Sequence, residues 1–250
     1  MGLEGKVAVV TGGSRGIGAA TVRLLAGRGA TVVVNYVRSA ETAGQLVSEI
    51  EAAGGRAKAV QADISKTDDI RRLIATTMET YGRIDILISN AATMDFAIKP
   101  FLQMTWDEFA QKLNDEMRAA FELTQAVLPI MQQQHYGRIV YVSAELSKHP
   151  HPGFIALGAA KAALNTFCKY VAQECGQFGV TANIVSPGLV ETDANAHQPA
   201  EQKARVAAMT PLRRLGQPDD VAGAIAFFAS DDSKFLTGTY APVNGGSAMD

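Results

Sequence analysis

Residues 7–18 read VAVVTGGSRGIG, a short apolar run that leads straight into a glycine-rich turn. The run Val7–Val10 does not alternate between apolar and polar residues, which is typical of a strand buried on both faces, as in a parallel sheet. The glycines permit a tight turn and a close approach of the backbone to a ligand. A helix predicted near 17–28 follows at once, and a helix N-terminus favours a bound anion such as a pyrophosphate. This strand–turn–helix order therefore predicts a dinucleotide site.

The same alternation of strand and helix continues along the chain. Helices are predicted near 17–28, 40–53, 67–81, 105–134, 156–177 and 219–229. Further strands are predicted at Thr31–Asn35, Lys58–Ala62, Ile84–Ser89, Arg138–Ser143, Thr181–Ser186 and Tyr240–Val243. We therefore expect an α/β fold, a doubly wound, seven-stranded parallel sheet flanked by helices, in a single domain over residues 1–250. The irregular stretch at about 187–217 follows a late strand, at the edge where such sheets bind ligands, so it is a candidate substrate lid.

The composition argues against several other classes of protein. The 250 residues are 47% hydrophobic and carry a net charge of −2 without a basic stripe, so we expect no nucleic-acid partner. No signal pattern or long apolar run is found, so we expect no membrane span. Cys168 and Cys175 lie seven residues apart on a predicted helix, which fits core or interface packing and neither a disulfide framework nor a metal site. A reducing, cytoplasmic setting is the resulting expectation.

Several segments resemble one known family, the short-chain dehydrogenases/reductases. TGGSRGIG at residues 11–18 resembles the family fingerprint T-G-x-x-x-G-x-G. Asp63-Ile64 resembles the pair that contacts adenine, and NAA at 90–92 resembles the family's N-A-G turn. SPGLVET at 186–192 resembles the loop that meets the nicotinamide carboxamide and the pyrophosphate, and RLGQP at 214–218 resembles a C-terminal segment. The resemblance spans essentially the whole chain and is closest to bacterial 3-oxoacyl-(acyl carrier protein) reductases.

This resemblance implies a Rossmann-type fold and a defined set of cofactor-binding residues. They come from the glycine-rich turn, from the ends of the next strands and from the late loop: Gly12, Ser14, Arg15, Gly16, Ile17, Gly18, Asn35, Tyr36, Arg38, Ser39, Asp63, Ile64, Asn90, Ala91, Ala92, Lys161, Pro187, Gly188, Val190 and Thr192.

The choice between NAD and NADP follows from charge. An acidic side chain after the second strand would accept hydrogen bonds from the ribose hydroxyls of NAD and would repel a 2′-phosphate. Residues 35–39 read NYVRS, and no acid occurs in this segment before Glu41. Arg38 and Arg15 can both reach the added phosphate, whose geometry a guanidinium matches with two hydrogen bonds. The expected cofactor is therefore NADP(H), although a solvated Arg38 at a helix start is the alternative.

The reaction centre departs from the family pattern. Family members reduce a carbonyl with a hydride from the nicotinamide and a proton from a tyrosine, whose pKa is lowered by a lysine four residues later. Lys161 matches that lysine, but Leu157 stands at the tyrosine position. Ala144 stands at the position of the serine that polarises the carbonyl, and Glu116 at that of the asparagine that positions a relay water. Leucine has no transferable proton, so the usual mechanism cannot operate unchanged.

Lys161, Glu116 and Ser143 are the candidate catalytic residues. Glu116 should lie near Lys161, as a structural ion pair or as a proton relay. Ser143 fills the serine role only if the end of its strand twists, because alternation turns it away from residue 144. His149 and His151 border the expected pocket and could donate a proton, although loop histidines are more often solvated.

Two aromatic residues near this centre have their own interpretations. Tyr141 lies inside a predicted strand and is expected in the core. Phe154 stands seven residues before Lys161, where enoyl-thioester reductases of this fold carry their tyrosine. An enoyl reduction tolerates the missing hydroxyl better, because hydride addition yields an enolate that water can protonate later. The pocket walls are expected from residues 93–101, 145–156 and 189–212, which contain Phe96, Phe101, Phe154, Met209 and Leu212.

Three functions remain open. The first is an atypical NADPH-dependent oxidoreductase that reduces a carbonyl or enoyl group of a small-molecule or carrier-bound acyl or polyketide substrate. The second is a non-catalytic NADP(H)-binding subunit of an active homologue, and the third is a sensor of NADPH. The long helices near 105–134 and 156–177 resemble those through which the family assembles, so a homotetramer or dimer is expected.

Overall fold

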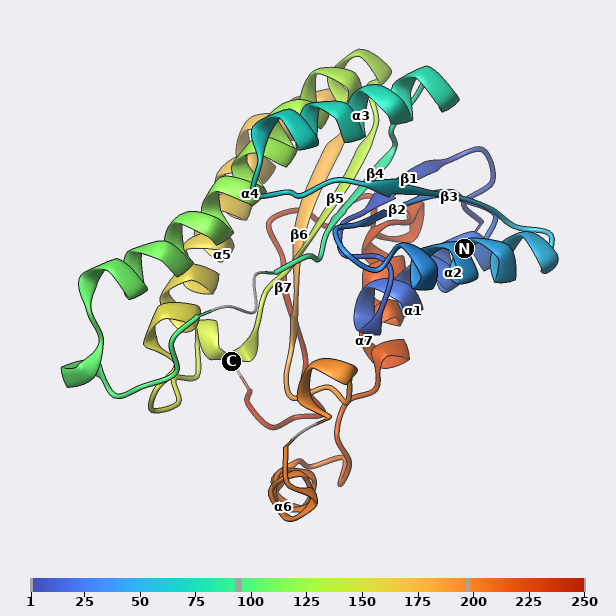
Figure 1. The fold of residues 1–250 in the computed structure, drawn as a ribbon. Coiled ribbons are helices and arrows are strands. Elements are labelled where there is room, and N and C mark those ends of the chain that lie inside the picture. Colours follow the sequence, from blue (N-terminus) through green and yellow to red (C-terminus); the bar gives the residue numbers. More distant parts are fainter. Residues whose placement is uncertain (1, 93–95, 197, 250) are drawn as a thin grey trace.

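The computed structural model describes residues 2–92, 96–196 and 198–249. Within these residues, seven strands form one parallel sheet in the order β3-β2-β1-β4-β5-β6-β7 (Figure 1). This order confirms the predicted doubly wound α/β fold, with the reversal between β1 and β4. The strands are β1 (Val7–Val10), β2 (Thr31–Tyr36), β3 (Arg56–Gln61), β4 (Ile86–Ser89), β5 (Gly137–Val142), β6 (Val180–Pro187) and β7 (Tyr240–Val243).

Helices cover both faces of the sheet. One face carries α1 (Gly16–Gly27), α2 (Ala40–Ala52) and α7 (Pro218–Phe228), and the other carries α3 (Thr67–Tyr81), α4 (Trp106–Gln134) and α5 (Ile155–Cys175) (Figure 1). Ala8 and Val10 pack into the first layer and Val9 into the second. This two-sided burial explains why the strands lack polar alternation. Among the described residues, no helix is both long and apolar enough to cross a membrane.

The fourth strand is shorter than predicted. It begins at Ile86, although the apolar pattern starts at Ile84. The side-chain amide of Gln134, at the end of α4, accepts from the N–H of Ile84 at 3.1 Å and donates to its C=O at 2.8 Å. Because these backbone groups bond to a side chain instead of a neighbouring strand, Ile84 is not part of the sheet. Its side chain is nevertheless buried.

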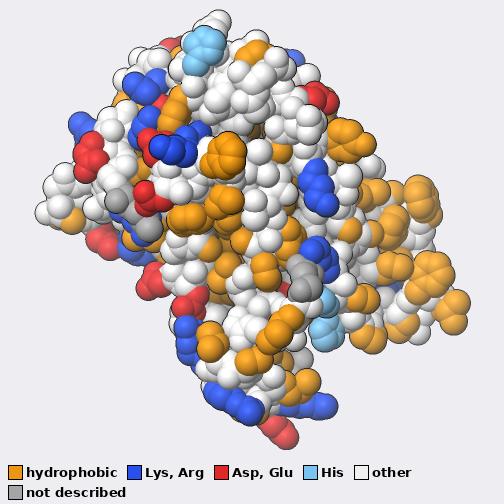
Figure 2. Space-filling model, turned by 180° about the vertical axis from the view of Figure 1, so that it is seen from behind, with side chains coloured by type: hydrophobic (Ala, Val, Ile, Leu, Met, Phe, Trp, Pro, Cys, Tyr) orange, Lys and Arg blue, Asp and Glu red, His pale blue; other side chains and the backbone are white. Residues whose placement is uncertain are grey.

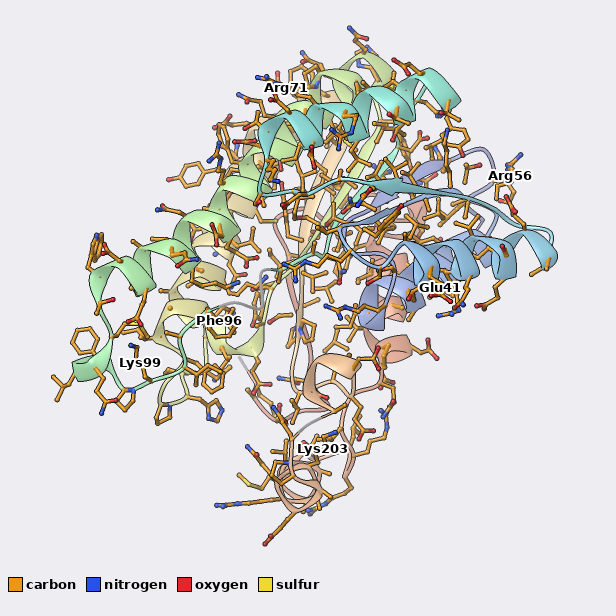
Figure 3. The ribbon with its side chains drawn as sticks, viewed as in Figure 1. Glu41, Arg56, Arg71, Phe96, Lys99 and Lys203 are labelled. Carbon is orange, nitrogen blue, oxygen red and sulfur yellow. The ribbon has the colours of Figure 1, made fainter. Side chains whose placement is uncertain are left out.

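The stretch at 187–217 is less irregular than predicted. It contains η4 (Asp193–Asn195) and the helix α6 (Ala200–Met209), which projects away from the sheet and carries Lys203 (Figures 1 and 3). None of the α6 residues, all of them described, is buried. A helix with no fully buried side chain lacks the continuous apolar stripe by which a helix is predicted from sequence. Its use as a lid stays a prediction.

Hydrophobic side chains gather at one edge of the molecule, on the right in Figure 2. Phe101 and Leu102 of η1 (Phe101–Gln103) and Trp106 at the start of α4 are 71%, 95% and 73% exposed. Of the expected pocket-wall residues, Phe101, Met209 and Leu212 are therefore largely exposed, whereas Phe96 and Phe154 are half-buried. Residues 93–95 and 197, which also fall in the expected walls or lid, lie outside the described residues.

Candidate functional site

The glycine-rich turn after β1 is held by two asparagines from neighbouring strands. Asn35 of β2 accepts from the N–H of Gly12 at 3.3 Å and donates to the C=O of Ala62 at 2.8 Å. Asn90, just after β4, donates to the C=O of Thr11 at 2.9 Å. A Cβ at Gly18 would lie 2.1 Å from the carbonyl oxygen of Gly12, so only glycine fits where α1 approaches the turn.

A cleft of about 840 Å³ opens beside this turn, at the carboxyl ends of the strands. Most of the predicted cofactor residues line it: Gly12, Ser14, Arg15, Gly16, Ile17, Gly18, Tyr36, Arg38, Ser39, Asp63, Ile64, Asn90, Ala91, Ala92 and Thr192. The structure thus brings together segments that are dispersed between residues 12 and 192 of the chain.

Five predicted cofactor residues are not in the cleft lining. Asn35 is buried and supports the turn from behind. Lys161 is also buried, and Pro187, Gly188 and Val190 lie along the end of β6 and the loop after it. Conversely, five residues that the sequence did not predict also line the cleft: Val37, Ser65, Asp115, Ala119 and Asp193. Ala119 could have been found from Glu116, because it lies three residues later and shares its helix face. Asp115 lies four residues before Ala119 on that side of the helix.

Two guanidinium groups face the part of the cleft next to β2. Arg15 belongs to the glycine-rich turn and Arg38 follows β2 directly. Within the described chain, neither forms an ion pair with a carboxylate. Both therefore remain available to an anionic ligand. Asp63 also lines the cleft, but it accepts from the N–H and hydroxyl of Ser65.

A buried cluster of charges lies where α4 and α5 meet the end of β5. The ammonium of Lys161, on α5, donates to Oε1 of Glu116 at 2.5 Å and to the C=O of Val142 at 2.8 Å. Lys112, one turn before Glu116 on α4, donates to Oε2 at 3.0 Å. The expected contact between Glu116 and Lys161 is therefore present. Lys112 was missed, although the i, i+4 spacing of Lys112 and Glu116 on a helix is a recognisable signal.

The two lysines keep the carboxylate ionised. Burial raises the pKa of Glu116, but the nearby ammonium groups of Lys161 and Lys112 outweigh burial and hold this pKa below its ordinary value of 4.5. Burial lowers the pKa of Lys161, and the Glu116 carboxylate opposes that shift only in part. Glu116 is thus an anion at neutral pH and an acceptor of hydrogen bonds.

Ser143 is not brought into the cleft. Its N–H donates to the C=O of Val185 at 2.8 Å, which continues the regular pairing of β5 with β6. Its hydroxyl is buried and has no hydrogen-bond partner among the described residues. The backbone pairing at Ser143 is thus regular, and its catalytic role stays a prediction. Leu157 and Ala144 are half-buried, and neither side chain carries a proton donor.

The remaining candidates lie outside the cleft lining. Tyr141 is fully buried, as predicted, and its hydroxyl is 2.6 Å from that of Thr124. Burial raises the pKa of this phenol, so it is a poor proton donor. His149 is half-buried and His151 is exposed. Among the described residues, no group of three or more His, Cys, Asp or Glu side chains could hold a metal ion.

Replacing Glu116 by glutamine should lower the free energy of unfolding by about 3 kcal/mol, because two buried ammonium groups would lose their shared carboxylate. Chemical denaturation at pH 7 measures this loss. In the unchanged protein, the contribution of Glu116 is present above pH 4.5 and is lost as the pH falls through its lower folded pKa. Glu122→Gln, which breaks the exposed pair with Arg118 on the same helix, is the control and should change little. Equal effects of the two substitutions would contradict the prediction.

Comparison with known proteins decides the family. A profile described as Enoyl-(Acyl carrier protein) reductase matches residues 12–248. The chain belongs to the short-chain dehydrogenase/reductase family. This short-chain dehydrogenase/reductase is 40% identical over 249 residues to the 3-oxoacyl-[acyl-carrier-protein] reductase of Synechocystis sp., and the alignment covers 99% of this chain and 98% of that relative.

Solved structures of the family agree with the fold. A dehydrogenase/reductase from Sinorhizobium meliloti superposes with a TM-score of 0.90 at 37% identity, covering 99% of this chain and 97% of that one. A short chain dehydrogenase from Burkholderia cenocepacia, in complex with NADP, superposes with a TM-score of 0.87 at 36% identity and 98% coverage of both chains. The family that the sequence motifs predicted is confirmed.

Proposed function

We propose that this short-chain dehydrogenase/reductase is an NADP(H)-dependent oxidoreductase that reduces a carbonyl or enoyl group without a tyrosine as proton donor. The observation that carries this proposal is the cleft of about 840 Å³, which is lined by the glycine-rich turn, including Arg15, and by Arg38. The Burkholderia cenocepacia relative in complex with NADP supports it. The similarity to a 3-oxoacyl-[acyl-carrier-protein] reductase suggests an acyl substrate, small or carrier-bound.

The residues present fit such a cofactor. Gly12 and Gly16 adopt φ values of 61° and 53°, and the N-terminus of α1, which begins within this turn, would offer backbone N–H groups to a pyrophosphate. Ser14 and Thr192 lie in the same cleft wall and can donate hydroxyl hydrogen bonds. No acid occurs among residues 35–40, so a 2′-phosphate meets no like charge there.

When bound, NADPH would supply the hydride. Of this chain's residues, Glu116 faces the cleft, and Lys161 lies behind it with its ammonium bound to Glu116 and Val142. We assign the catalytic roles to these two residues: Glu116 lines the cleft and relays a proton between the substrate and the ammonium of Lys161, which does not line the cleft itself. Leu157 presents an apolar surface where a phenol would stand, which favours substrates whose protonation is not tied to hydride transfer.

Turnover tests the proposal directly. Pure protein with NADPH should consume the cofactor, followed by its absorbance, with at least one member of a panel of 3-oxoacyl, enoyl and quinone substrates. A rate no higher than that of the buffer control for every substrate, together with tight NADPH binding, would overturn the reductase assignment. It would leave cofactor binding intact.

Arg38→Ala should reduce the preference for NADPH over NADH by about 10- to 100-fold, because one charge-assisted pair with the 2′-phosphate is lost. Calorimetric titration with both cofactors measures the two dissociation constants. Arg71→Ala, on the outer face of α3, removes an equal charge far from the cleft and should leave the preference unchanged (Figure 3). If the preference survives Arg38→Ala intact, Arg38 is only a solvated residue at the helix start.

A second candidate is a non-catalytic subunit that binds NADP(H) and assembles with an active homologue. It is favoured by the combination of Leu157, Ala144 and a Lys161 ammonium that is held by Glu116. The outward sides of α4 and α5, which leave Phe121 and Tyr170 exposed, would supply the contacts of a dimer or tetramer. Co-purification with a tyrosine-containing homologue would support this role, and a homogeneous, catalytically active homo-oligomer would contradict it.

A further inference from the structure

The C-terminal segment (residues 244–249) connects the candidate lid to the segment that follows β5. It begins after β7 and is the red trace that ends near the label C in Figure 1. The N–H of Leu212, which lies shortly after α6, donates to the C=O of Gly245 at 3.2 Å. The hydroxyl of Ser247 donates to Oε2 of Glu145, in η2 (Glu145–Ser147), at 2.9 Å. The last residues of the chain therefore contact both the lid and the segment that follows β5.

The shape of the C-terminal segment is fixed by its own hydrogen bonds and by glycine. The side-chain carbonyl of Asn244 accepts from the N–H of Gly246 at 3.0 Å. Gly245 adopts a φ of 64°, and a Cβ there would lie 2.7 Å from Cγ2 of Thr210. The backbone thus lies directly against the arm of the lid (residues 210–212), an approach that only glycine permits. The C-terminal segment therefore supports this arm as a preformed turn.

The candidate lid obtains no burial from its helix. None of the α6 residues, all of them described, is buried, whereas Thr210, directly after the helix, is 5% exposed. The parallel bridge between Val190 and Gly216 closes the neck of the lid. Beyond that neck, the arm rests on the C-terminal segment. Segments with few buried contacts open at a small cost in free energy, so the position of α6 depends on the support that the arm receives.

Glu145 fixes the C-terminal segment on the side of the reaction centre. It directly follows Ala144, and a Cβ on Gly188, at the start of the lid, would lie 2.8 Å from its Oε2. The same Cβ would lie 3.0 Å from the Cβ of Asn244, so Glu145 and the C-terminal segment enclose Gly188 together. Among the described residues, the hydroxyl of Ser247 is the side-chain donor that the carboxylate binds. One hydrogen bond thus joins the support of the lid to the residue beside Ala144.

We propose that Glu145 is a positioning residue for the substrate, which fastens the C-terminal segment through Ser247 and thereby holds the lid against the reaction centre. The inference rests on the function proposed above, because a lid acts only if a substrate binds beneath it. The lining of the cofactor cleft includes neither Glu145 nor Ser247. Loss of their contact should therefore weaken substrate binding and leave the affinity for NADPH unchanged. A general packing defect would weaken both.

Trypsin cleavage reports the position of the lid without a substrate. The enzyme cleaves after Lys203 and Arg205 of α6 only when that helix opens, so the rate follows the open population. In the full-length protein with NADPH, Glu145→Ala and Ser247→Ala should each raise this rate about fivefold, because one hydrogen bond to a charged group is lost. Glu145→Gln keeps an acceptor for Ser247 and should stay within about twofold of the unchanged protein. Glu79→Ala, which removes an exposed carboxylate from α3, is the matched control and should have no effect.

Steady-state kinetics test the effect on the substrate. With a substrate that the unchanged protein reduces, KM should rise about fivefold in Glu145→Ala and in Ser247→Ala, while kcat changes by less than about twofold. The double variant should match the single ones, since both remove the same bond. Effects that multiply in the double variant, an unchanged cleavage rate, or faster cleavage with an unchanged KM would overturn the inference. Absence of turnover in the unchanged protein would instead contradict the proposed function, and the cleavage rates would still decide whether Glu145 fastens the lid.

Discussion

Gly18→Ala should weaken NADPH binding by about 100-fold, because the added methyl group would lie 2.1 Å from the carbonyl oxygen of Gly12. That oxygen belongs to the backbone and cannot move away alone. The added Cβ would also lie 2.8 Å from Nδ2 of Asn90, whose hydrogen bond to Thr11 holds the turn after β1. Separating α1 from the turn would displace the N–H groups that we propose to bind the pyrophosphate. Fluorescence or calorimetric titration with NADPH measures the effect.

Gly27→Ala provides the control for this substitution. Gly27 lies at the other end of the same helix, and a Cβ there would meet no atom within 4 Å. Alanine has the higher helix propensity, so the control should fold at least as well as the unchanged protein and bind NADPH equally. If Gly18→Ala also binds NADPH normally, the pyrophosphate does not rest on this turn.

Leu157→Tyr combined with Ala144→Ser should create or raise 3-oxoacyl reductase activity by about 100-fold or more, the range that a positioned general acid contributes. Residue 157 is four positions before Lys161 on α5, so a phenol there shares a helix face with the ammonium. A serine at 144 would place a hydroxyl on the segment that follows β5. NADPH consumption with a 3-oxoacyl thioester measures the gain.

Leu157→Phe with Ala144→Ser isolates the contribution of the phenol. It introduces the same ring without the hydroxyl, so packing changes are nearly matched and no proton donor is added. We expect no gain in this variant. A tyrosine variant that binds NADPH but gains nothing over the phenylalanine variant would show that the pocket does not hold a ketone near C4 of the nicotinamide.

The structure also gives a reason why Leu157→Tyr with Ala144→Ser could restore only part of the reductase activity. In known members of the family, the lysine assists a tyrosine, whereas here Lys161 is engaged by Glu116 at 2.5 Å. Glu116→Asn added to the tyrosine–serine pair should therefore raise activity further, as it frees the ammonium of Lys161. A decrease on this third substitution would indicate that Glu116 itself takes part in turnover.

The sequence by itself determined the features whose causes are local. A pattern within a dozen residues predicts that Val7–Val10 is a buried strand and that a glycine-rich turn follows it. The repetition of strand and helix predicts the parallel sheet, and the turn predicts the cleft beside it. That Leu157 stands where the family carries its tyrosine follows from the resemblance, which places this position four residues before Lys161. The limits of local reasoning show at Ile84, where a side-chain amide 50 residues away replaces a strand partner.

Only the tertiary structure decided which charges share a site. Lys161 and Glu116 are 45 positions apart, and their contact depends on the packing of α4 against α5. Lys112 joins the same cluster from within α4, where its ammonium donates to Oε2 of Glu116 at 3.0 Å. Ser143 is the opposite case, in which neighbours in the sequence are separated by the fold. It is adjacent in the sequence to the expected serine position, but its backbone pairs with β6 and the residue is buried. Patterns along a chain reveal which residues face the same side of one element, whereas electrostatic interactions act through space between elements, so the composition of the charged cluster could be settled only by the fold.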